Sequence, residues 1–189
     1  RYGVMLREDG IVMDDGTAAR FSEKHFVVTT TTANAVAVYR NMEFVRQCLK
    51  PQLDVHLISI TEAWAQFAVA GPLSRDLIAR VADIDVSNEE FPFMACAEIQ
   101  LKNGLRARLF RISFSGELAY EIAVPIRFGH DFFEYLLEIG ENLGVTPYGT
   151  EALAVLRIEK GHAAGAELNG QTTAQMLGLG RMVSRKKDS

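Results

Sequence analysis

Short apolar runs separated by polar turns dominate the first thirty residues, which predicts β-strands. The turn at residues 7–10, Arg-Glu-Asp-Gly, separates the first two runs. The expected strands are residues 2–6, 11–13, 17–21 and 25–30. The acidic pair Asp14-Asp15 with Gly16 therefore lies between two predicted strands.

The pattern then changes to a helical period. Residues 32–49 place apolar side chains on one face at spacings of four, three and four, with Thr32 as the expected N-cap and Lys50-Pro51 as the stop. The residues of this face are Val38, Met42, Val45 and Leu49. A strand that leads into a helix is expected here.

The rest of the chain alternates strands and helices. We expect a strand pair at 55–59 and 64–70, and a helix at 73–81 after Gly71-Pro72. An acidic loop at 82–90 precedes strands at 91–99, 105–113 and 118–124, of which the first two join through a turn at 102–104. Helices are expected at 131–139 and 150–160, the second with Leu153, Val155 and Leu156 inward. The fold class predicted is α+β, with mostly antiparallel sheets and packed helices.

Composition places the chain among ordinary globular proteins. It has 189 residues, of which 48% are hydrophobic and 23% charged, with net charge −4 and pI near 5.6. These values argue against a general nucleic-acid or anionic-membrane surface, and no apolar run approaches the ~20 residues of a membrane span. Cys48 and Cys96 make neither a disulfide framework nor a metal-ligand pattern, so a cytoplasmic protein without a metal site is expected.

Both ends of the sequence suggest a piece of a larger protein. Arg1 stands directly in strand-like sequence, and the basic cluster at Arg181 and residues 185–187 predicts a solvated tail. We therefore expect a partial domain over residues 1–180, incomplete at both ends, and a tail at 181–189 that leads to a further domain.

Two acidic positions are the candidates for chemistry. Asp14 and Asp15 repel one another, so they suit either a polar hairpin turn or a site where a ligand compensates the charge. Glu121 stands in a strand beside Tyr120 and Ile122. It either faces solvent on the alternate side of that strand or binds a ligand with amide or ring N–H donors.

Several ordered motifs resemble the aminomethyltransferase family, the T-protein of the glycine cleavage system. They are residues 2–5, 11–15, 67–72, 111–121 and 156–161. Other stretches are more similar to the alpha subunits of heterotetrameric sarcosine oxidases. These are residues 29–32, 61–64, 147–153 and 178–183. The resemblance covers nearly the whole chain and implies an aminomethyltransferase, folate-binding fold.

The resemblance also implies roles for individual residues. Asp15 matches the family's catalytic aspartate, although a slip of one residue to Asp14 stays open. Glu121 matches the glutamate that binds the pterin ring, and Tyr2 an aromatic residue of the folate channel. Thr30 falls at a folate contact. The resemblance thus predicts that Asp15 and Glu121 line one cavity.

Two positions depart from the transferase pattern. Phe114 stands where the transferases have a tyrosine, which removes a hydroxyl but keeps a ring that can stack. Leu153 replaces an arginine that the transferases use. Both differences favour the oxidase interpretation over an amine-donor transferase.

The implied function is capture of the one-carbon unit of oxidised sarcosine as 5,10-methylenetetrahydrofolate. The cofactor expected on this chain is tetrahydrofolate, and the expected partners are the other subunits of a heterotetramer. No G-x-G-x-x-G fingerprint occurs, so flavin and NAD are expected elsewhere, and the piece alone is expected to be inactive as an oxidoreductase.

Three other hypotheses stay open. The first is an aminomethyltransferase of the glycine cleavage type. The second is a non-catalytic folate-binding module of the kind linked to iron–sulfur protein maintenance, although residues 160–165 lack the cysteine of its signature. The third is a scaffold that has lost folate binding. His162 beside Gly161 is expected to be a capping or core histidine rather than a base.

Overall fold

A computed structural model describes residues 1–184, and these form two compact units. The first unit combines residues 1–59 with the segment that starts at Ala163, and the second unit is residues 60–162. Each unit is described below by itself. The predicted tail at 181–189 falls mostly at residues 185–189, which lie outside the described part.

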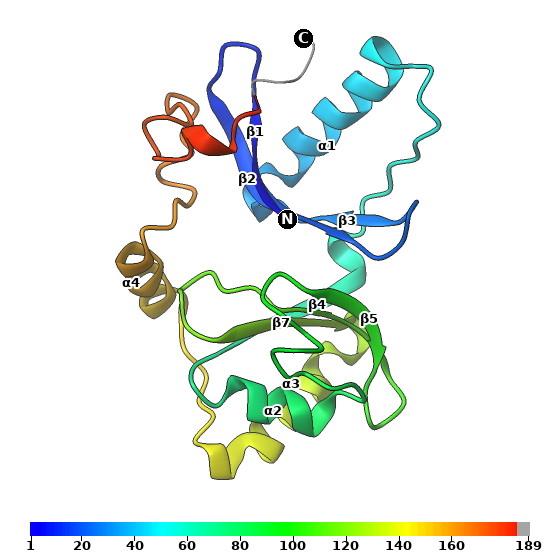
Figure 1. Cartoon of the computed structure of the whole chain (residues 1–189), viewed down its shortest axis with the longest axis vertical. Helices are drawn as coiled ribbons and strands as arrows, with labels where there is room; N and C mark the ends of the chain where they lie inside the picture. Colours follow the sequence, from blue (N-terminus) through cyan, green and yellow to red (C-terminus); the bar gives the residue numbers. More distant parts are fainter. Residues whose placement is uncertain (185–189) are drawn as a thin grey trace. The chain divides into compact units, whose positions relative to one another are not determined.

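The first unit contains a three-stranded antiparallel sheet in the order β1-β2-β3 (Figure 1). Its elements are β1 (Tyr2–Leu6), β2 (Val12–Arg20) and β3 (Phe26–Val28), followed by a 3-10 turn (Thr32–Asn34), α1 (Ala35–Phe44) and a π-helical turn (Val45–Leu49). The C-terminal segment returns to the start of β2, where the Val12 N–H donates to the Thr172 carbonyl oxygen at 2.9 Å. A small core of Val12, Leu168 and Ala174 joins the two parts of this unit.

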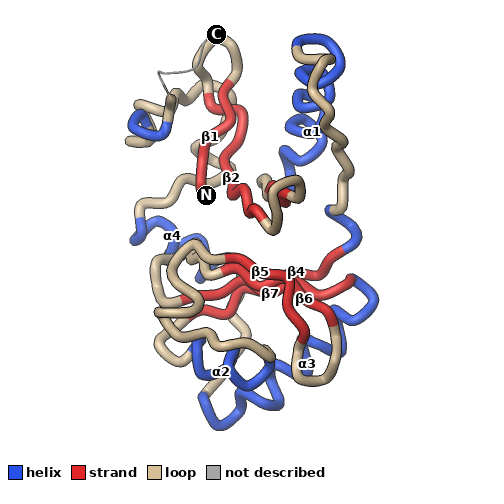
Figure 2. The backbone as a smooth tube through the Cα atoms, turned by 45° about the vertical axis from the view of Figure 1, so that its right-hand side comes forward, coloured by secondary structure: helices blue, strands red, loops and turns tan. Residues whose placement is uncertain are grey.

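The second unit is a four-stranded antiparallel sheet in the order β4-β7-β6-β5. Its elements are β4 (Trp64–Ala70), α2 (Ser74–Val81), β5 (Cys96–Gln100), β6 (Arg106–Phe110), β7 (Ala119–Pro125), α3 (Gly129–Gly140) and α4 (Thr150–Lys160). Helices α2 and α3 pack on the same face of this sheet (Figures 1 and 2). Glycines in left-handed conformation end the β5–β6 turn at Gly104 and helix α4 at Gly161.

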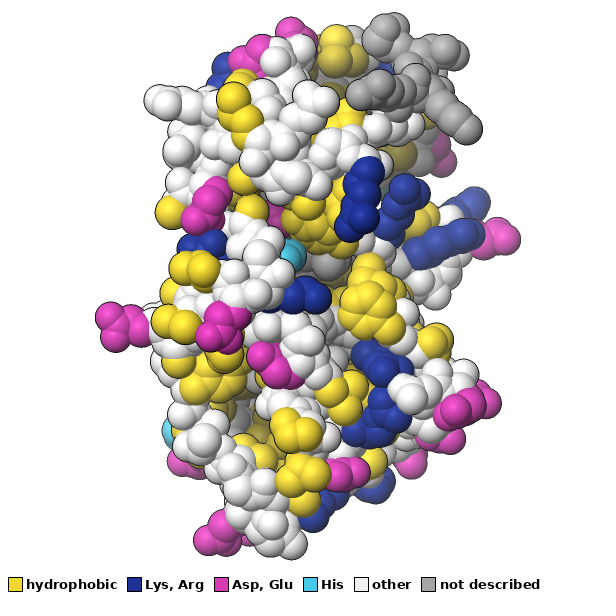
Figure 3. Space-filling view, turned by 60° about the vertical axis from the view of Figure 1, so that its left-hand side comes forward, with side chains coloured by type: hydrophobic (Ala, Val, Ile, Leu, Met, Phe, Trp, Pro, Cys, Tyr) yellow, Lys and Arg dark blue, Asp and Glu magenta, His cyan; other side chains and the backbone are white. Residues whose placement is uncertain are grey.

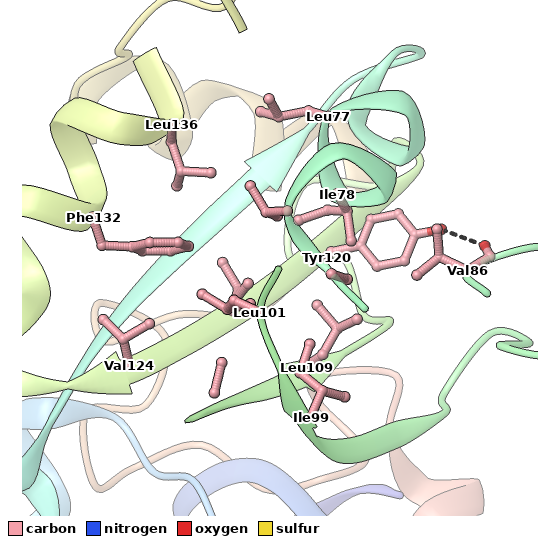
Figure 4. Packing of buried hydrophobic residues seen from close by; sticks show 14 of the residues in the cluster. Leu77, Ile78, Val86, Ile99, Leu101, Leu109, Tyr120, Val124, Phe132 and Leu136 are labelled. Carbon is pink, nitrogen blue, oxygen red and sulfur yellow. Dashed lines mark hydrogen bonds between the residues drawn. The ribbon is translucent and has the colours of Figure 1, made fainter. Parts of the chain in front are cut away.

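The core of the second unit lies between the sheet and helices α2 and α3. Leu77 and Ile78 of α2 and Phe132 and Leu136 of α3 point toward the inward residues of the strands (Figure 4). These inward strand residues include Ile99, Leu109, Tyr120, Ile122 and Val124. The Tyr120 hydroxyl donates to the Val86 carbonyl oxygen at 3.3 Å, which satisfies the polar atom of a fully buried ring.

The α+β class with antiparallel sheets is confirmed, as are most predicted elements. Residues 55–59 were wrongly predicted as a strand: they are irregular, and β4 pairs with β7 instead. Val155 was predicted to face inward, but this residue is 58% exposed. Thr32 lies within the 3-10 turn, where no side-chain cap hydrogen bond forms, so it is not the N-cap of a single long helix.

The predicted break at the acidic pair is also wrong, because β2 runs without interruption from Val12 to Arg20. Asp14, Asp15 and Gly16 pair in register with Met5, Val4 and Gly3 of β1. Gly16 is needed for a close approach rather than for a turn. A Cβ there would lie 1.9 Å from the Thr29 carbonyl oxygen, whereas a Cβ on Gly3, directly across the strand pair, would meet nothing within 4 Å.

We therefore expect Gly16→Ala to lower the free energy of unfolding by about 3 kcal/mol, the upper range for overpacking a fixed site. Thermal and urea unfolding of the intact protein measure this. Gly3→Ala is the matched control, because it adds the same methyl group to the paired position and should change stability by no more than about 0.5 kcal/mol. Equal stability of the two variants would contradict the close approach.

Candidate functional site

The two aspartates of β2 point to opposite faces of the sheet and accept hydrogen bonds from different partners. Asp14 is 0% exposed, and its two carboxylate oxygens accept hydrogen bonds from the Thr31 N–H at 2.9 Å and from the Asn34 side-chain amide at 3.2 Å. These bonds fasten the segment between β3 and α1 to the sheet. Asp14 therefore has a structural role. This bears on the match to the family's catalytic aspartate, for which the sequence leaves both Asp14 and Asp15 open.

Asp15 faces the other side of β2 and has a different partner. The Tyr2 hydroxyl of β1 donates to Asp15 Oδ2 at 2.7 Å, and Asp15 is only 9% exposed. Burial, followed by the hydrogen bond to Asp15, raises the pKa of the Tyr2 hydroxyl far above its usual value. Tyr2 thus stays protonated and can orient the Asp15 carboxylate.

This Tyr2–Asp15 hydrogen bond was missed in the sequence, where Tyr2 is expected only to line a channel. The register could have revealed it. The turn at residues 7–10 pairs β1 with β2, and Tyr2 and Asp15 then fall on the same face one diagonal apart.

The threonine run after β3 lies against β2. Thr29 Oγ1 accepts from the Thr17 N–H at 3.0 Å, and the Thr31 N–H binds Asp14. Thr30, the predicted folate contact, is half-buried between them, and its hydroxyl donates to the Thr31 carbonyl oxygen at 3.2 Å. The structure therefore places Thr30 in the same unit as Tyr2 and Asp15.

Glu121 lies in the second unit, in the middle of β7. Its alternation with Tyr120 and Ile122 directs it to the sheet face opposite the core and helices α2 and α3. Burial raises the pKa of the Glu121 carboxyl above its usual value, and a hydrogen bond from the Gln66 amide to Glu121 Oε2 opposes that rise. Glu121 is thus neither an exposed surface glutamate nor a member of the core.

Small or aromatic side chains surround Glu121 on its sheet face. Ala68 of β4 and Phe110 of β6 lie directly across from it, and Ala119 and Ala123 are its same-face neighbours along β7. None of these side chains carries a hydrogen-bond donor. The carboxylate therefore has apolar side chains as its direct neighbours on this sheet face, of which Phe110, Ala119 and Ala123 are buried.

Other polar and aromatic groups lie in the same unit as Glu121. Burial, and then the negative charges of Glu117 and Glu121, raise the pKa of the Tyr148 hydroxyl, so this hydroxyl lies within electrostatic reach of both carboxylates. Phe114 packs edge-on against the His162 ring, with ring centroids 4.8 Å apart. His162 closes the end of α4 with a backbone N–H bond to the Arg157 carbonyl oxygen, as expected of a capping residue.

A separate hollow of about 440 Å³ lies near the β5–β6 turn and the start of α3. Its lining includes Leu105, Phe128, Asp131 and Tyr135, and none of the predicted site residues. Within residues 1–184, no group of three or more histidine, cysteine or acidic side chains could hold a metal ion. In that same range, no helix is long and apolar enough to cross a membrane.

The side chains exposed to solvent mix charge and apolar surface. On the face drawn in Figure 3, acidic and basic side chains lie among hydrophobic ones, in agreement with the modest net charge of −4. The candidates for chemistry are two carboxylates with little exposure, Asp15, which is buried, and Glu121, which is half-buried.

Comparison with known proteins defines the family to which this chain belongs. Residues 1–187 match the model of the GCVT N-terminal domain, so the chain belongs to this family. It is 53% identical to the sarcosine oxidase subunit alpha of Rhizobium meliloti (strain 1021) over 99% of its own length and 19% of that subunit. It is 46% identical to the subunit of the same name from Corynebacterium sp. (strain U-96), over 100% of the chain and 20% of the subunit.

Similarity to the aminomethyltransferases is lower. Identity to the aminomethyltransferase of Geobacillus sp. (strain WCH70) is 30% over the whole chain and half of that enzyme. The chain is thus related to the alpha subunit of an enzyme, sarcosine oxidase, and spans about a fifth of the length of those subunits.

Solved structures support the fold. The glycine cleavage aminomethyltransferase T of Bartonella henselae superposes with a TM-score of 0.77 at 26% identity, over 92% of this chain and 44% of that one. The predicted aminomethyltransferase fold is therefore confirmed. A chain of the heterotetrameric sarcosine oxidase of Corynebacterium sp. U-96 is similar with a TM-score of 0.55, over 78% of this chain and 82% of that one. Its 9% identity supports the fold only.

The raised pKa of Glu121 has a consequence for stability. A carboxyl whose pKa is higher in the folded than in the unfolded protein binds its proton more tightly when folded. Stability is therefore lost as the pH rises from the unfolded pKa of about 4.3 through the raised folded pKa. We expect Glu121→Gln to be more stable than the parent protein at pH 7 to 8, and the difference to disappear near pH 4.

Urea unfolding of the intact protein at several pH values measures this dependence. Glu62→Gln is the control, because Glu62 is exposed in the short turn before β4 and should show no comparable trend. A Glu121→Gln variant that is less stable than the parent at pH 8 would show that the carboxylate is a structural anchor.

Proposed function

We propose that this chain is a tetrahydrofolate-binding domain that takes part in one-carbon transfer, in the manner of a sarcosine oxidase alpha subunit. The observation that carries the proposal is Glu121: a partly buried carboxylate on an apolar sheet face, held by one neutral amide donor. Desolvating a carboxylate without a cationic partner is costly, and such groups concentrate at binding and catalytic sites.

The residues around Glu121 suit a pterin ring. Such a ring is flat and presents an edge of N–H donors, which a carboxylate can accept in a paired, charge-assisted arrangement. Ala68, Ala119 and Ala123 place only small apolar side chains beside Glu121. Phe114, a contact predicted from the family, supplies an aromatic ring in the same unit.

Asp15 is assigned the role in chemistry. When bound, tetrahydrofolate supplies the amine nitrogens that accept a one-carbon unit. A carboxylate beside such a nitrogen stabilises the positive charge that develops and can move a proton. The Tyr2 hydroxyl fixes the direction of the Asp15 carboxylate, while Asp14, whose two oxygens are occupied by Thr31 and Asn34, supports the strand.

The assignment to sarcosine oxidase rather than to amine-donor transfer rests on similarity and on one position. Identity to the two alpha subunits, 53% and 46%, exceeds the 30% found with the Geobacillus aminomethyltransferase. Leu153 on α4 offers no guanidinium group where the transferases use one. By the same relationship we propose other oxidase subunits as partners, with flavin and NAD bound outside these residues, and a cytoplasmic location.

Calorimetric titration with tetrahydrofolate tests the binding role. The intact protein should bind with a saturable heat at pH 7. Glu121→Gln should weaken the affinity about 30-fold, or about 2 kcal/mol, because charge-assisted hydrogen bonds to the ring are lost. Absence of any saturable heat for the parent protein would leave the scaffold hypothesis, and an unchanged affinity of Glu121→Gln would remove that residue from the site.

A separate experiment tests Asp15. In the intact enzyme supplied with sarcosine and tetrahydrofolate, Asp15→Asn should leave sarcosine oxidation and folate affinity near the parent values. Formation of 5,10-methylenetetrahydrofolate should fall by at least about 100-fold, the lower range for loss of an acid–base group. The one-carbon unit should then appear as free formaldehyde. An equal yield of 5,10-methylenetetrahydrofolate from variant and parent would rule out this role.

A further inference from the structure

We infer that Gln66 is a positioning residue of the folate site: its side-chain amide holds the Glu121 carboxylate in place for the ligand. The inference rests on the proposed function and extends it to a residue outside the family motifs. Gln66 acts through Glu121.

The strand register brings the two side chains together. Gln66 pairs with Ala123 and Ala68 with Glu121 in the β4–β7 ladder. Gln66 and Glu121 therefore occupy the same sheet face on adjacent strands, one diagonal step apart, which is within reach of long side chains. The Gln66 Nε2 amide donates to Glu121 Oε2.

Within residues 60–162, no other side chain donates a hydrogen bond to the Glu121 carboxylate. The direct neighbours of Glu121 on the sheet face are alanines and Phe110, which have no donor. Arg108, two residues before Phe110 on β6, is paired with Glu98 at 3.2 Å, and its guanidinium lies 4.1 Å from the centre of the Trp64 ring. Gln66 is thus the donor that this unit supplies to the carboxylate.

The hydrogen bond from Gln66 opposes the effect of burial on the Glu121 carboxyl. Burial raises the pKa of the carboxyl and Gln66 lowers it, so the amide works against loss of the charge. Two other charged or titratable groups of this unit bear on Glu121: Arg108, which lies on the same sheet face and is paired with Glu98, and Tyr148, whose hydroxyl is influenced by the charge of Glu121. A neutral amide is suitable here, because a lysine or arginine would compete with the N–H edge of the ligand for the carboxylate oxygens.

Gln66→Met tests the inference, because it keeps the length of the side chain and removes the donor. Two readouts are taken on the intact protein. The first is the carboxyl pKa of Glu121, from carbon NMR without ligand, assigned by its absence in Glu121→Gln. The second is tetrahydrofolate affinity from pH 5.5 to 8.5. Gln100→Met is the matched control, since Gln100 is exposed on β5 of the same sheet.

We expect Gln66→Met to raise the Glu121 pKa and to weaken affinity about tenfold at pH 7, as expected for one lost hydrogen bond to a charged group. In the parent protein, affinity should fall at low pH as Glu121 becomes protonated. In Gln66→Met this fall should begin at a higher pH, so the variant loses more affinity at pH 6 than at pH 8. Gln66→Met should have no further effect in a Glu121→Gln background. If Gln66 had only a structural role, its substitution would not change the pH at which affinity falls.

The outcomes separate this inference from the proposed function. If the parent protein binds tetrahydrofolate but Gln66→Met leaves both the Glu121 pKa and the affinity profile unchanged, the inference is wrong and the proposed function stands. If the parent protein binds no tetrahydrofolate, the proposed function is wrong and so is a folate role for Gln66. The NMR titration then shows only whether the amide sets the charge of Glu121.

Discussion

The desolvation of one carboxylate, Glu121, is the constraint on which this account depends. A charged side chain on the face of a sheet normally remains in water, where its ionised form is most stable. Here burial disfavours that form, and a hydrogen bond from the neutral Gln66 amide opposes the effect of burial. A sheet that keeps such a group in place maintains an energetically poor position, and a ligand with N–H donors would relieve it.

The second carboxylate is held by different means. Asp15 is directed by a protonated tyrosine across the β1–β2 pair, and its neighbour Asp14 fastens the following segment through backbone and amide hydrogen bonds. The close approach of Gly16 to Thr29 keeps that segment against β2. Two adjacent aspartates of one strand thus serve separate purposes, because strand alternation sends them to opposite faces.

Much of the fold follows from the amino-acid pattern, and the failures have physical reasons. Helices α2, α3 and α4 and most strands of the second unit were predictable because periodicity and turn residues agree in these regions, but the strand predicted at 91–99 begins only at Cys96. The unbroken β2 was not, since an Asp-Asp-Gly sequence has the composition of a turn and only the contact of Gly16 with Thr29 explains the glycine. Residues 55–59 have strand-like composition but no strand partner, and pairing is a tertiary property.

The candidate site was predictable only in part. Family resemblance singled out Asp15, Glu121, Tyr2, Thr30 and Phe114, but residue identity alone does not separate Asp14 from Asp15 or reveal Gln66, which depend on register.

The most direct test of the central claim is a crystal structure of the protein with tetrahydrofolate. The account predicts pterin N–H groups within hydrogen-bond distance, about 2.7–3.2 Å, of the Glu121 carboxylate. A ligand bound elsewhere, for example in the hollow beside Phe128 and Tyr135, would contradict it.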